Sequence, residues 1–288
     1  MIGTYGDNCI DRYLSPRRMD LVGGNAVNVA VHLTSLGAKA IYVGAVGNDP
    51  EGQKIRRALA DRGVDRTHVV PREGRTGLTV IDLHGGERSF PEEDVGVQCP
   101  LTLSPQARQA LVGCEWVHVT AFTSWNIRWS AACPDLVEEL QWLDAQGVKL
   151  SLDFSALDQP DLARLVGRSL ELAFASRPAG GVEETGKMCQ FLQECGVREV
   201  VVTMGAGGSL WSDGRRTVSV PAPSLRPLDT LGAGDAFVAA WLEARGRGED
   251  VPRCMERATA RAAEVCRHFG AWPQMQLAME SDEAGVEP

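Results

Sequence analysis

No stretch of this 288-residue chain approaches the run of about 18 apolar residues that a membrane-spanning helix requires. Residues 1–7 also lack a basic region followed by an apolar core, which is the pattern of a secretory signal peptide. We therefore expect a cytoplasmic protein without a membrane partner. The formal net charge of −9 disfavours nucleic acid as a main partner, because its phosphates repel an acidic protein. A local group of backbone amides can still bind ATP against this overall charge.

Several familiar motifs are missing, and each absence excludes a class of protein. The eight cysteines form no C-x-x-C pair and no histidine stands at zinc-finger spacing, so we expect reduced and mostly buried thiols. Lys39 and Lys54 belong to no G-x-x-x-x-G-K, which argues against a P-loop kinase. A dinucleotide-dependent oxidoreductase needs G-x-G-x-x-G directly after its first strand, where this chain has Gly6-Asp7-Asn8 instead.

Short apolar runs alternate with helical patterns along the chain. Continuous apolar strands between amphipathic helices are typical of a parallel sheet that helices cover on both faces. Buried strands are expected at 40–46, 116–120, 148–153, 172–175 and 199–203. Helices are expected at 25–36, 52–62, 105–112, 133–146, 183–195, 235–244 and 251–267. The pattern predicts an α/β fold with a mostly parallel central sheet, in one domain over residues 1–280, followed by a polar, disordered tail at 281–288.

One segment interrupts this alternation. Residues 76–83 have strand character, and the turn signal His84-Gly85-Gly86-Glu87 precedes Arg88-Ser89-Phe90. Together with residues 12–20 this hairpin predicts a small second sheet beside the main one. The alternative is a surface hairpin without a role.

The most informative stretch is Asp229-Thr230-Leu231-Gly232-Ala233-Gly234-Asp235-Ala236-Phe237. Its glycines let backbone amides converge at the start of a helix, where unsatisfied N–H groups and the helix dipole favour an anion. An aspartate beside such a site can accept a proton from a hydroxyl that attacks a phosphate. The alternative is an ordinary loop that closes onto a helix, with Asp235 as a favourable N-terminal charge.

Two further segments carry hydrogen-bonding side chains where a ligand would need them. Asp7 and Asp11 follow the first strand, at a strand end of the kind where α/β sheets bind ligands. Asn25 and Asn28 stand three residues apart near the start of the next helix, so they share one face. Such groups suit a polyol. The alternatives are a solvated turn for the aspartates and a helix cap for Asn25.

A third glycine-rich segment, Thr203-Met204-Gly205-Ala206-Gly207-Gly208, follows a predicted strand. It is expected to be a phosphate or nucleotide loop, with a simple turn as the alternative.

These segments together resemble the ribokinase-like (PfkB-type) carbohydrate kinases. That family carries D-T-x-G-A-G-D-x-F, G-x-x-x-x-D followed by G-G-x-x-x-N, and T-x-G-x-x-G, and the fixed positions of each are present here. The resemblance implies a three-layer α/β/α fold and transfer of phosphate from ATP to a sugar. It implies that Asp235 is the catalytic base and that the amides of Gly232, Ala233 and Gly234 hold the transferred phosphoryl group. The sugar-binding positions that it implies are Asp11, Gly24, Asn25 and Asn28, beside Asp7, and the ATP-binding positions are Thr203, Gly205 and Gly208.

The resemblance also implies a lid over the sugar, built from about residues 12–20 and 76–95, which in many members pairs with a second subunit to form a homodimer. It places a monovalent-cation loop, for an ion such as K⁺, near residues 265–270 together with Asp229. On the lid, Arg88 is a candidate to bind a carboxylate of the substrate, the alternative being a solvated hairpin arginine.

One family motif is degraded. Most members carry N-x-x-E, tied to Mg²⁺ and phosphate, where this chain has Ser176-Arg177-Pro178-Ala179-Gly180-Gly181-Val182-Glu183-Glu184. Glu183 or Glu184 remains a weak candidate for Mg²⁺, which usually needs only one or two carboxylates.

Within the family, the runs Gly6–Asp11 and Gly23–Val31 and the triplet Gly270-Ala271-Trp272 are most similar to the fructoselysine 6-kinase group. The resemblance therefore implies phosphorylation of the 6-hydroxyl of a fructosamine. The alternatives are a kinase for fructose, 2-keto-3-deoxygluconate, ribose or a nucleoside, or a sugar-binding regulatory protein with degraded activity.

Overall fold

The computed structural model describes residues 1–84, 87–98, 102–121, 134–156, 160–177 and 181–274. The expected disordered tail at 281–288 and the turn at Gly85–Gly86 lie outside these residues. Within them, no helix combines the length and the apolar character that crossing a bilayer requires.

The main sheet has nine strands in the order β13-β12-β11-β10-β9-β8-β1-β4-β5. All neighbouring pairs from β11 to β5 are parallel, whereas β12 and β13 continue the sheet in antiparallel fashion. The strands are β1 (Ile2–Tyr5), β4 (Ala40–Gly47), β5 (Asp65–Arg72), β8 (Trp116–Thr120), β9 (Lys149–Asp153), β10 (Leu172–Ser176), β11 (Glu199–Thr203), β12 (Ser209–Ser212) and β13 (Thr217–Val220). The expected mostly parallel sheet is confirmed.

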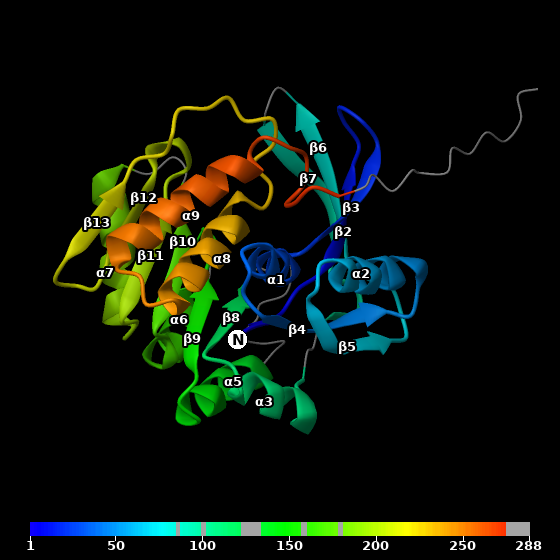
Figure 1. Ribbon diagram of the computed structural model, residues 1–288, viewed down its shortest axis with the longest axis horizontal. Helices are drawn as coiled ribbons and strands as arrows, with labels where there is room; N and C mark the ends of the chain where they lie inside the picture. The colour runs from blue at the N-terminus through cyan, green and yellow to red at the C-terminus, as the bar shows by residue number, and fades with distance from the viewer. Residues whose placement is uncertain (85–86, 99–101, 122–133, 157–159, 178–180, 275–288) are drawn as a thin grey trace, which may run out of the picture.

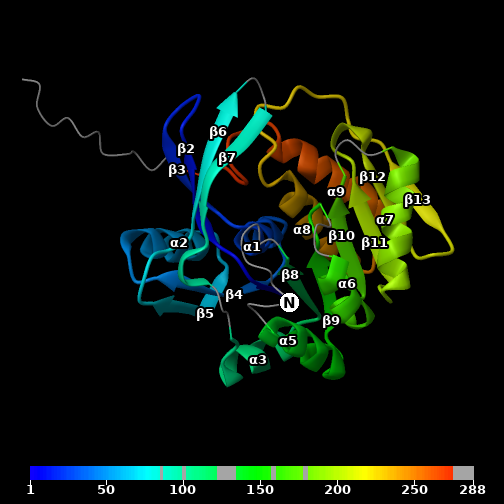
Figure 2. The ribbon, with the colours of Figure 1, turned by 180° about the vertical axis from the view of Figure 1, so that it is seen from behind.

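Helices cover both faces of this sheet (Figures 1 and 2). One apolar core joins the sheet to α3 (Pro105–Val112), α5 (Pro134–Ala145), α6 (Pro160–Val166) and α7 (Val182–Glu194). Two others join its opposite face to α1 (Asn25–Ser35), α2 (Pro50–Asp61), α8 (Ala233–Gly246) and α9 (Val251–Val265). The result is the three-layer α/β/α arrangement that the sequence predicted.

The small second sheet is also present and stands beyond the main sheet (Figure 1). Its order is β3-β2-β6-β7, and β2 pairs with β6 in parallel while the other two pairs are antiparallel. Its strands are β2 (Cys9–Tyr13), β3 (Met19–Gly23), β6 (Leu78–His84) and β7 (Glu87–Asp94). We call this sheet the lid.

Capping side chains explain where several helices begin. Asp49 accepts a hydrogen bond from the Gly52 amide at 2.8 Å, and Pro50 at the first helical position fits the fixed φ of the first turn. Helix α2 therefore begins two residues before the predicted Gly52. Helix α8 likewise begins at Ala233, so Asp235 lies inside its first turn rather than at its start.

Candidate active site

Helix α8 begins with an uncapped, glycine-lined turn. Gly232 adopts a left-handed conformation with φ of 74°, and a Cβ atom there would lie 2.3 Å from the Cβ atom of Ala271. Gly232 is the N-cap residue and has no side chain that could bond to the first turn. The backbone amide of Ala233 donates a hydrogen bond of 3.3 Å to the Thr230 carbonyl. A Cβ atom on Gly234 would meet nothing within 4 Å among the described residues, which leave this end of the helix open to a ligand. The turn suits a phosphoryl group because the positive end of the helix dipole faces it.

Asp235 lies in this first turn and is buried, with 6% of its surface exposed. Its Oδ2 atom accepts a hydrogen bond of 2.7 Å from the Asn28 amide on α1. Burial raises the pKa of Asp235 well above its usual value, the Asn28 bond partly opposes this, and the charges of Asp153, Asp7 and Asp11 raise it further. A carboxylate with a raised pKa accepts a proton near neutral pH, as a general base must.

Asp7 holds helix α1 in place. Its carboxylate accepts hydrogen bonds from the amides of Asn25 (2.7 Å) and Ala26 (3.2 Å) and from the Thr120 hydroxyl (2.6 Å). Gly24, with φ of 99°, permits this contact because a Cβ atom there would lie 2.4 Å from the Asn8 Cα atom. Asp7, a predicted sugar-binding residue, therefore acts on the site by fixing α1 and with it Asn28.

Asp11 lies on β2 of the lid and is buried. Its Oδ1 atom accepts a hydrogen bond of 3.3 Å from the Cys9 thiol, and burial, with the Asp11 charge next, raises the pKa of that thiol. A Cβ atom on Gly23 would lie only 1.9 Å from the Asp11 Oδ2 atom, so glycine at position 23 makes room for this carboxylate.

The side-chain amide oxygen of Asn28 is buried and has no hydrogen-bond partner within the described part of the chain, which leaves an acceptor for a ligand.

Asp153, at the end of β9, is a site residue that the sequence analysis missed. Burial raises its pKa to about 6, the Ser155 amide bond at 2.8 Å opposes this, and the Asp7 charge adds to it. Ser155 has φ of 49°, the one left-handed non-glycine residue in the described ranges, and this strained turn aims its amide at Asp153. The available signal was a carboxylate ending a buried parallel strand, the same signal that singled out Asp7 at the first strand.

The glycine loop after β11 lies on the other side of β9 from Asp7, since β10 and β11 follow β9 in the sheet. The Thr203 hydroxyl at the strand end is 3.2 Å from the Ser176 hydroxyl. Gly205 and Gly208 have φ of 55° and 90°, and a Cβ atom on Gly208 would lie 2.2 Å from the Val220 carbonyl oxygen. Along this edge of the sheet, the strand order therefore places Asp153, at the end of β9, between the Thr203 loop and Asp7.

The two glutamates proposed for Mg²⁺ do not join this cluster. Glu183 and Glu184 occupy the first turn of α7, where their side chains are 82% and 55% exposed. Glu183 pairs with Lys187 at 2.7 Å and Glu184 with Arg177 at 3.6 Å. Neither is among the charges that shift the pKa of Asp235.

Asp229 is buried in the loop before α8 and is surrounded by donors. Its carboxylate accepts hydrogen bonds from the Tyr13 hydroxyl (2.5 Å) and from the amides of Leu231 (2.9 Å) and Gly270 (3.0 Å).

Arg88, the candidate to bind a substrate carboxylate, falls in β7 opposite Leu83, but its side chain lies outside the described part of the structure.

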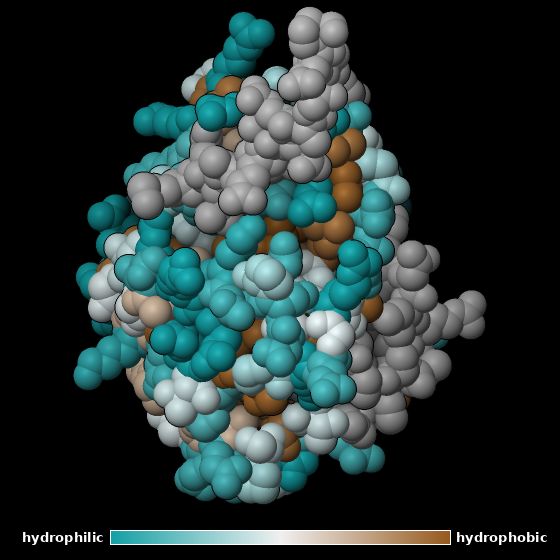
Figure 3. Space-filling view, turned by 90° about the vertical axis from the view of Figure 1, so that its right-hand side faces the viewer, coloured by the Kyte–Doolittle hydropathy of each residue, from teal (hydrophilic) through white to brown (hydrophobic). Residues whose placement is uncertain are grey.

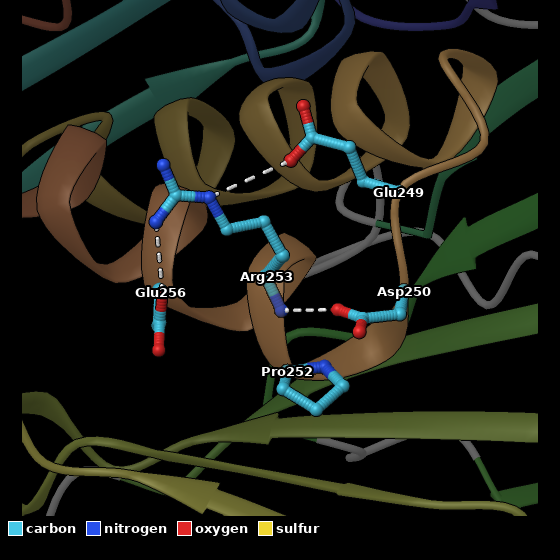
Figure 4. Close-up of a pocket in the computed structure, with 5 residues that line it drawn as sticks. All are labelled: Glu249, Asp250, Pro252, Arg253 and Glu256. Carbon is cyan, nitrogen blue, oxygen red and sulfur yellow. Dashed lines mark hydrogen bonds and ion pairs between the residues drawn. The ribbon is translucent and has the colours of Figure 1, made fainter.

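Two surface hollows in the described part of the chain lie away from Asp235. One, at the opposite end of α8, is lined by Glu249, Asp250, Pro252, Arg253 and Glu256, and Arg253 pairs there with its acidic neighbours (Figure 4). The other, of about 540 Å³, opens between the first turn of α2 and the lid surface that carries Arg12 and Val80. The molecular face on this side is mainly hydrophilic, with some exposed apolar side chains (Figure 3). Neither hollow includes a carboxylate of the Asp235 cluster.

Comparison with known proteins gives this geometry a context. The model of the pfkB family of carbohydrate kinases matches residues 20–276. The chain is 33% identical over 271 residues to fructoselysine 6-kinase of Shigella flexneri, covering 94% of this chain and 99% of that protein. It is 29% identical to the fructosamine kinase FrlD of Bacillus subtilis, covering 93% and 91%. Among solved structures, a ribokinase of Arabidopsis thaliana complexed with ribose and ATP superimposes with a TM-score of 0.80 at 22% identity, covering 94% of this chain and 93% of that one.

Proposed function

We propose a sugar substrate for this chain, which belongs to the pfkB family of carbohydrate kinases and is an ATP-dependent sugar kinase. The proposed sugar is a fructosamine such as fructoselysine. The product would be the 6-phosphate. The observation that carries the proposal is the buried Asp235 at the open end of α8, hydrogen-bonded to Asn28 and surrounded by other carboxylates.

The charge of the site favours a cationic sugar. Asp153, Asp7 and Asp11 each raise the pKa of Asp235, so the cluster is short of positive charge. A neutral sugar would leave this repulsion in place, whereas the secondary amine of a fructosamine carries a proton and would relieve it. The relatives named fructoselysine 6-kinase and fructosamine kinase support the same choice.

In the proposed reaction the sugar binds against Asp11 and Asn28 with its 6-hydroxyl at Asp235. Asp235 accepts the hydroxyl proton while the oxygen forms a bond to the γ-phosphorus and the bond from that phosphorus to the leaving ADP oxygen breaks. The open amides at Gly232 and Gly234 stabilise the charge on the phosphoryl oxygens. The Thr203 loop would hold the nucleotide.

Mg²⁺ fits a site of this composition, because Mg²⁺ prefers oxygen ligands and often takes a single carboxylate. Asp153 is the better candidate to hold it, since it is half-buried and its charge acts on Asp235, whereas Glu183 and Glu184 are exposed and ion-paired. When bound, the ion would neutralise charge on the phosphates of ATP.

A coupled ADP-release assay tests the substrate. The panel is fructoselysine, a second fructosamine, fructose, ribose and 2-keto-3-deoxygluconate, and we expect kcat/KM for fructoselysine to exceed that for fructose at least tenfold. Phosphorus NMR of the product should show a 6-phosphate. Equal or better use of fructose would contradict the fructosamine assignment. Sugar binding without ADP release for any member would favour the regulatory alternative.

The same assay tests the base. Asp235→Asn should lower kcat at least about 10²-fold, the scale of general-base catalysis, with little change in sugar affinity. Asp61→Asn, an exposed change at the end of α2, is the matched control and should leave kcat unaltered. An Asp235→Asn enzyme that keeps its turnover would exclude the assigned role.

A further inference from the structure

The lid is bound to the loop that precedes the anion-binding turn by one buried hydrogen bond. The Tyr13 hydroxyl on β2 donates to the Asp229 carboxylate at 2.5 Å, across 216 positions of sequence. Both side chains are buried, Tyr13 at 0% and Asp229 at 2% exposure. Burial, followed by the Asp229 charge, raises the pKa of the Tyr13 phenol far above its ordinary value, so the phenol remains a donor at any working pH.

The groups around Asp229 do not fit a monovalent cation. Its Oδ2 atom accepts from the Tyr13 hydroxyl and the Gly270 amide, and its Oδ1 atom accepts from the Leu231 amide. A bound cation needs oxygen acceptors directed at it, whereas these three neighbours present hydrogens.

Carbonyls of the expected cation loop are also engaged. The Cys266 carbonyl accepts the Leu228 amide at 2.8 Å, and the Phe269 carbonyl lies 3.2 Å from His268 Nδ1. At these two positions the carbonyl oxygen already faces a nitrogen, so a K⁺ ion at residues 265–270 would have to share these acceptors.

Apolar packing continues the same connection. The rings of Tyr13 and Phe269 meet edge to face with centroids 6.2 Å apart. Tyr13 and Leu21 belong to a buried apolar cluster, and the half-buried Phe269 and Leu231 pack against it. Gly270, with φ of 72°, lets the loop approach the lid so closely that a Cβ atom there would lie 2.5 Å from Leu21 Cδ1.

The next residues of the loop connect to the anion-binding turn and back to the lid. Ala271 packs directly over Gly232, where a side chain would collide with it at 2.3 Å. Gln274 exchanges two hydrogen bonds, of 2.7 and 2.8 Å, with the Val22 backbone on β3. The contacts thus run without a gap from the lid through residues 269–274 to Gly232, three positions before Asp235.

We propose that the lid itself, through the Tyr13 hydroxyl on Asp229, orders the turn that receives the transferred phosphate, and that this chain has no monovalent-cation site at Asp229. Tyr13 is then a positioning residue, because it acts on the reacting groups through Asp229 and the Gly232 turn. The proposal rests on the kinase function proposed above, and it reverses the expectation of a K⁺ ligand at Asp229.

The test compares K⁺ with tetramethylammonium, which is too large to replace a bound K⁺. The unchanged chain should have the same kcat, within about twofold, in both salts. Tyr13→Phe keeps the ring but removes the donor, and should lower kcat about tenfold while the sugar KM changes less than threefold. Since Asp229 then has a vacant acceptor, K⁺ should restore part of the lost kcat and raise the melting temperature of this variant alone.

Two further variants separate positioning from general damage. Tyr42→Phe also removes a buried phenol, one that bonds to Asn8 and the Gly6 carbonyl, and should gain no response to K⁺. Asp229→Asn should lose kcat as Tyr13→Phe does, but K⁺ should not rescue it because the negative charge is gone. Circular dichroism confirms that each variant is folded.

Thallium-205 NMR gives a readout that needs no turnover. Thallium(I), a substitute for K⁺, should bind Tyr13→Phe and not the unchanged chain. Strong thallium binding or at least tenfold K⁺ activation in the unchanged chain would overturn the proposal, as would full kcat in Tyr13→Phe. Because the thallium result does not depend on the sugar, a wrong fructosamine assignment and a wrong cation assignment remain distinguishable.

Discussion

At the scale of single residues, the chemistry depends on how the charges around Asp235 are arranged. Among the neighbouring charges, Asp153 raises the pKa of Asp235 most, and burial raises its own pKa to about 6. Carboxylates that interact through their charges do not titrate independently, so we expect the pH dependence of the reaction to reflect both.

Asp153→Asn should therefore shift the acidic limb of the kcat/KM profile to lower pH. The negative charge at position 153 opposes ionisation of Asp235, so its removal lowers the pKa of Asp235 and keeps the base ionised in more acidic solution. The asparagine oxygen can still accept the Ser155 amide, which preserves the turn. Profiles measured from pH 4 to 9 at saturating ATP provide the check.

Glu184→Gln is the matched control for this profile, because it also removes one carboxylate but from an exposed position paired with Arg177. Its acidic limb should stay where it is in the unchanged chain. A limb that Asp153→Asn leaves in place would mean that the two carboxylates do not interact in solution.

At the scale of elements, helix α1 matters because it presents Asn28 to Asp235. Its N-terminus is fixed by Asp7, whose carboxylate comes from the end of β1 and accepts two amides of the first turn. A shift of α1 would move Asn28 with it.

Asp7→Ala should lower both stability and turnover. Loss of the cap and of the Thr120 bond should reduce the free energy of unfolding by about 2 kcal/mol, measured by urea titration. The reduction in kcat should exceed tenfold, since Asn28 loses its fixed position. Asp49→Ala removes the comparable cap of α2 and should cost similar stability while kcat is retained. Equal kcat in the two variants would show that α1 does not need this anchor.

The elements also show what the sequence can and cannot predict. The parallel sheet, the helices on both faces and the lid follow from periodicity and turn residues, and α3 was predicted residue for residue. The sequence analysis did not single out Asp153, because its importance arises from strand order, which brings β9 beside β8 in space. The hydrogen bond between Tyr13 and Asp229 was not predicted for a similar reason: the two residues are distant in the chain, and tertiary packing alone brings them together.

At the scale of the whole molecule, we predict a homodimer formed through the lid. Leu14 directly follows lid strand β2, and Phe90 lies in lid strand β7. Their side chains are 44% and 43% exposed, although large apolar side chains are usually buried. Light scattering after size exclusion should give twice the chain mass at micromolar concentration. Changing both residues to Asp should give the monomer mass.

Leu165→Asp provides the comparison, because Leu165 is 50% exposed on α6, away from the lid, and its replacement should leave the mass unchanged. A single-chain mass for the unaltered protein at every concentration would contradict the prediction.

The bond between Asn28 and Asp235 has a consequence for biosynthesis. The two residues are 207 positions apart, so α1 emerges from the ribosome long before its partner has been translated. A nascent chain that ends before α8 lacks the proposed base and the proposed phosphate-binding turn, so we expect it not to consume ATP. We therefore expect kinase activity only after the C-terminal helices have been translated, and none from a prematurely terminated chain.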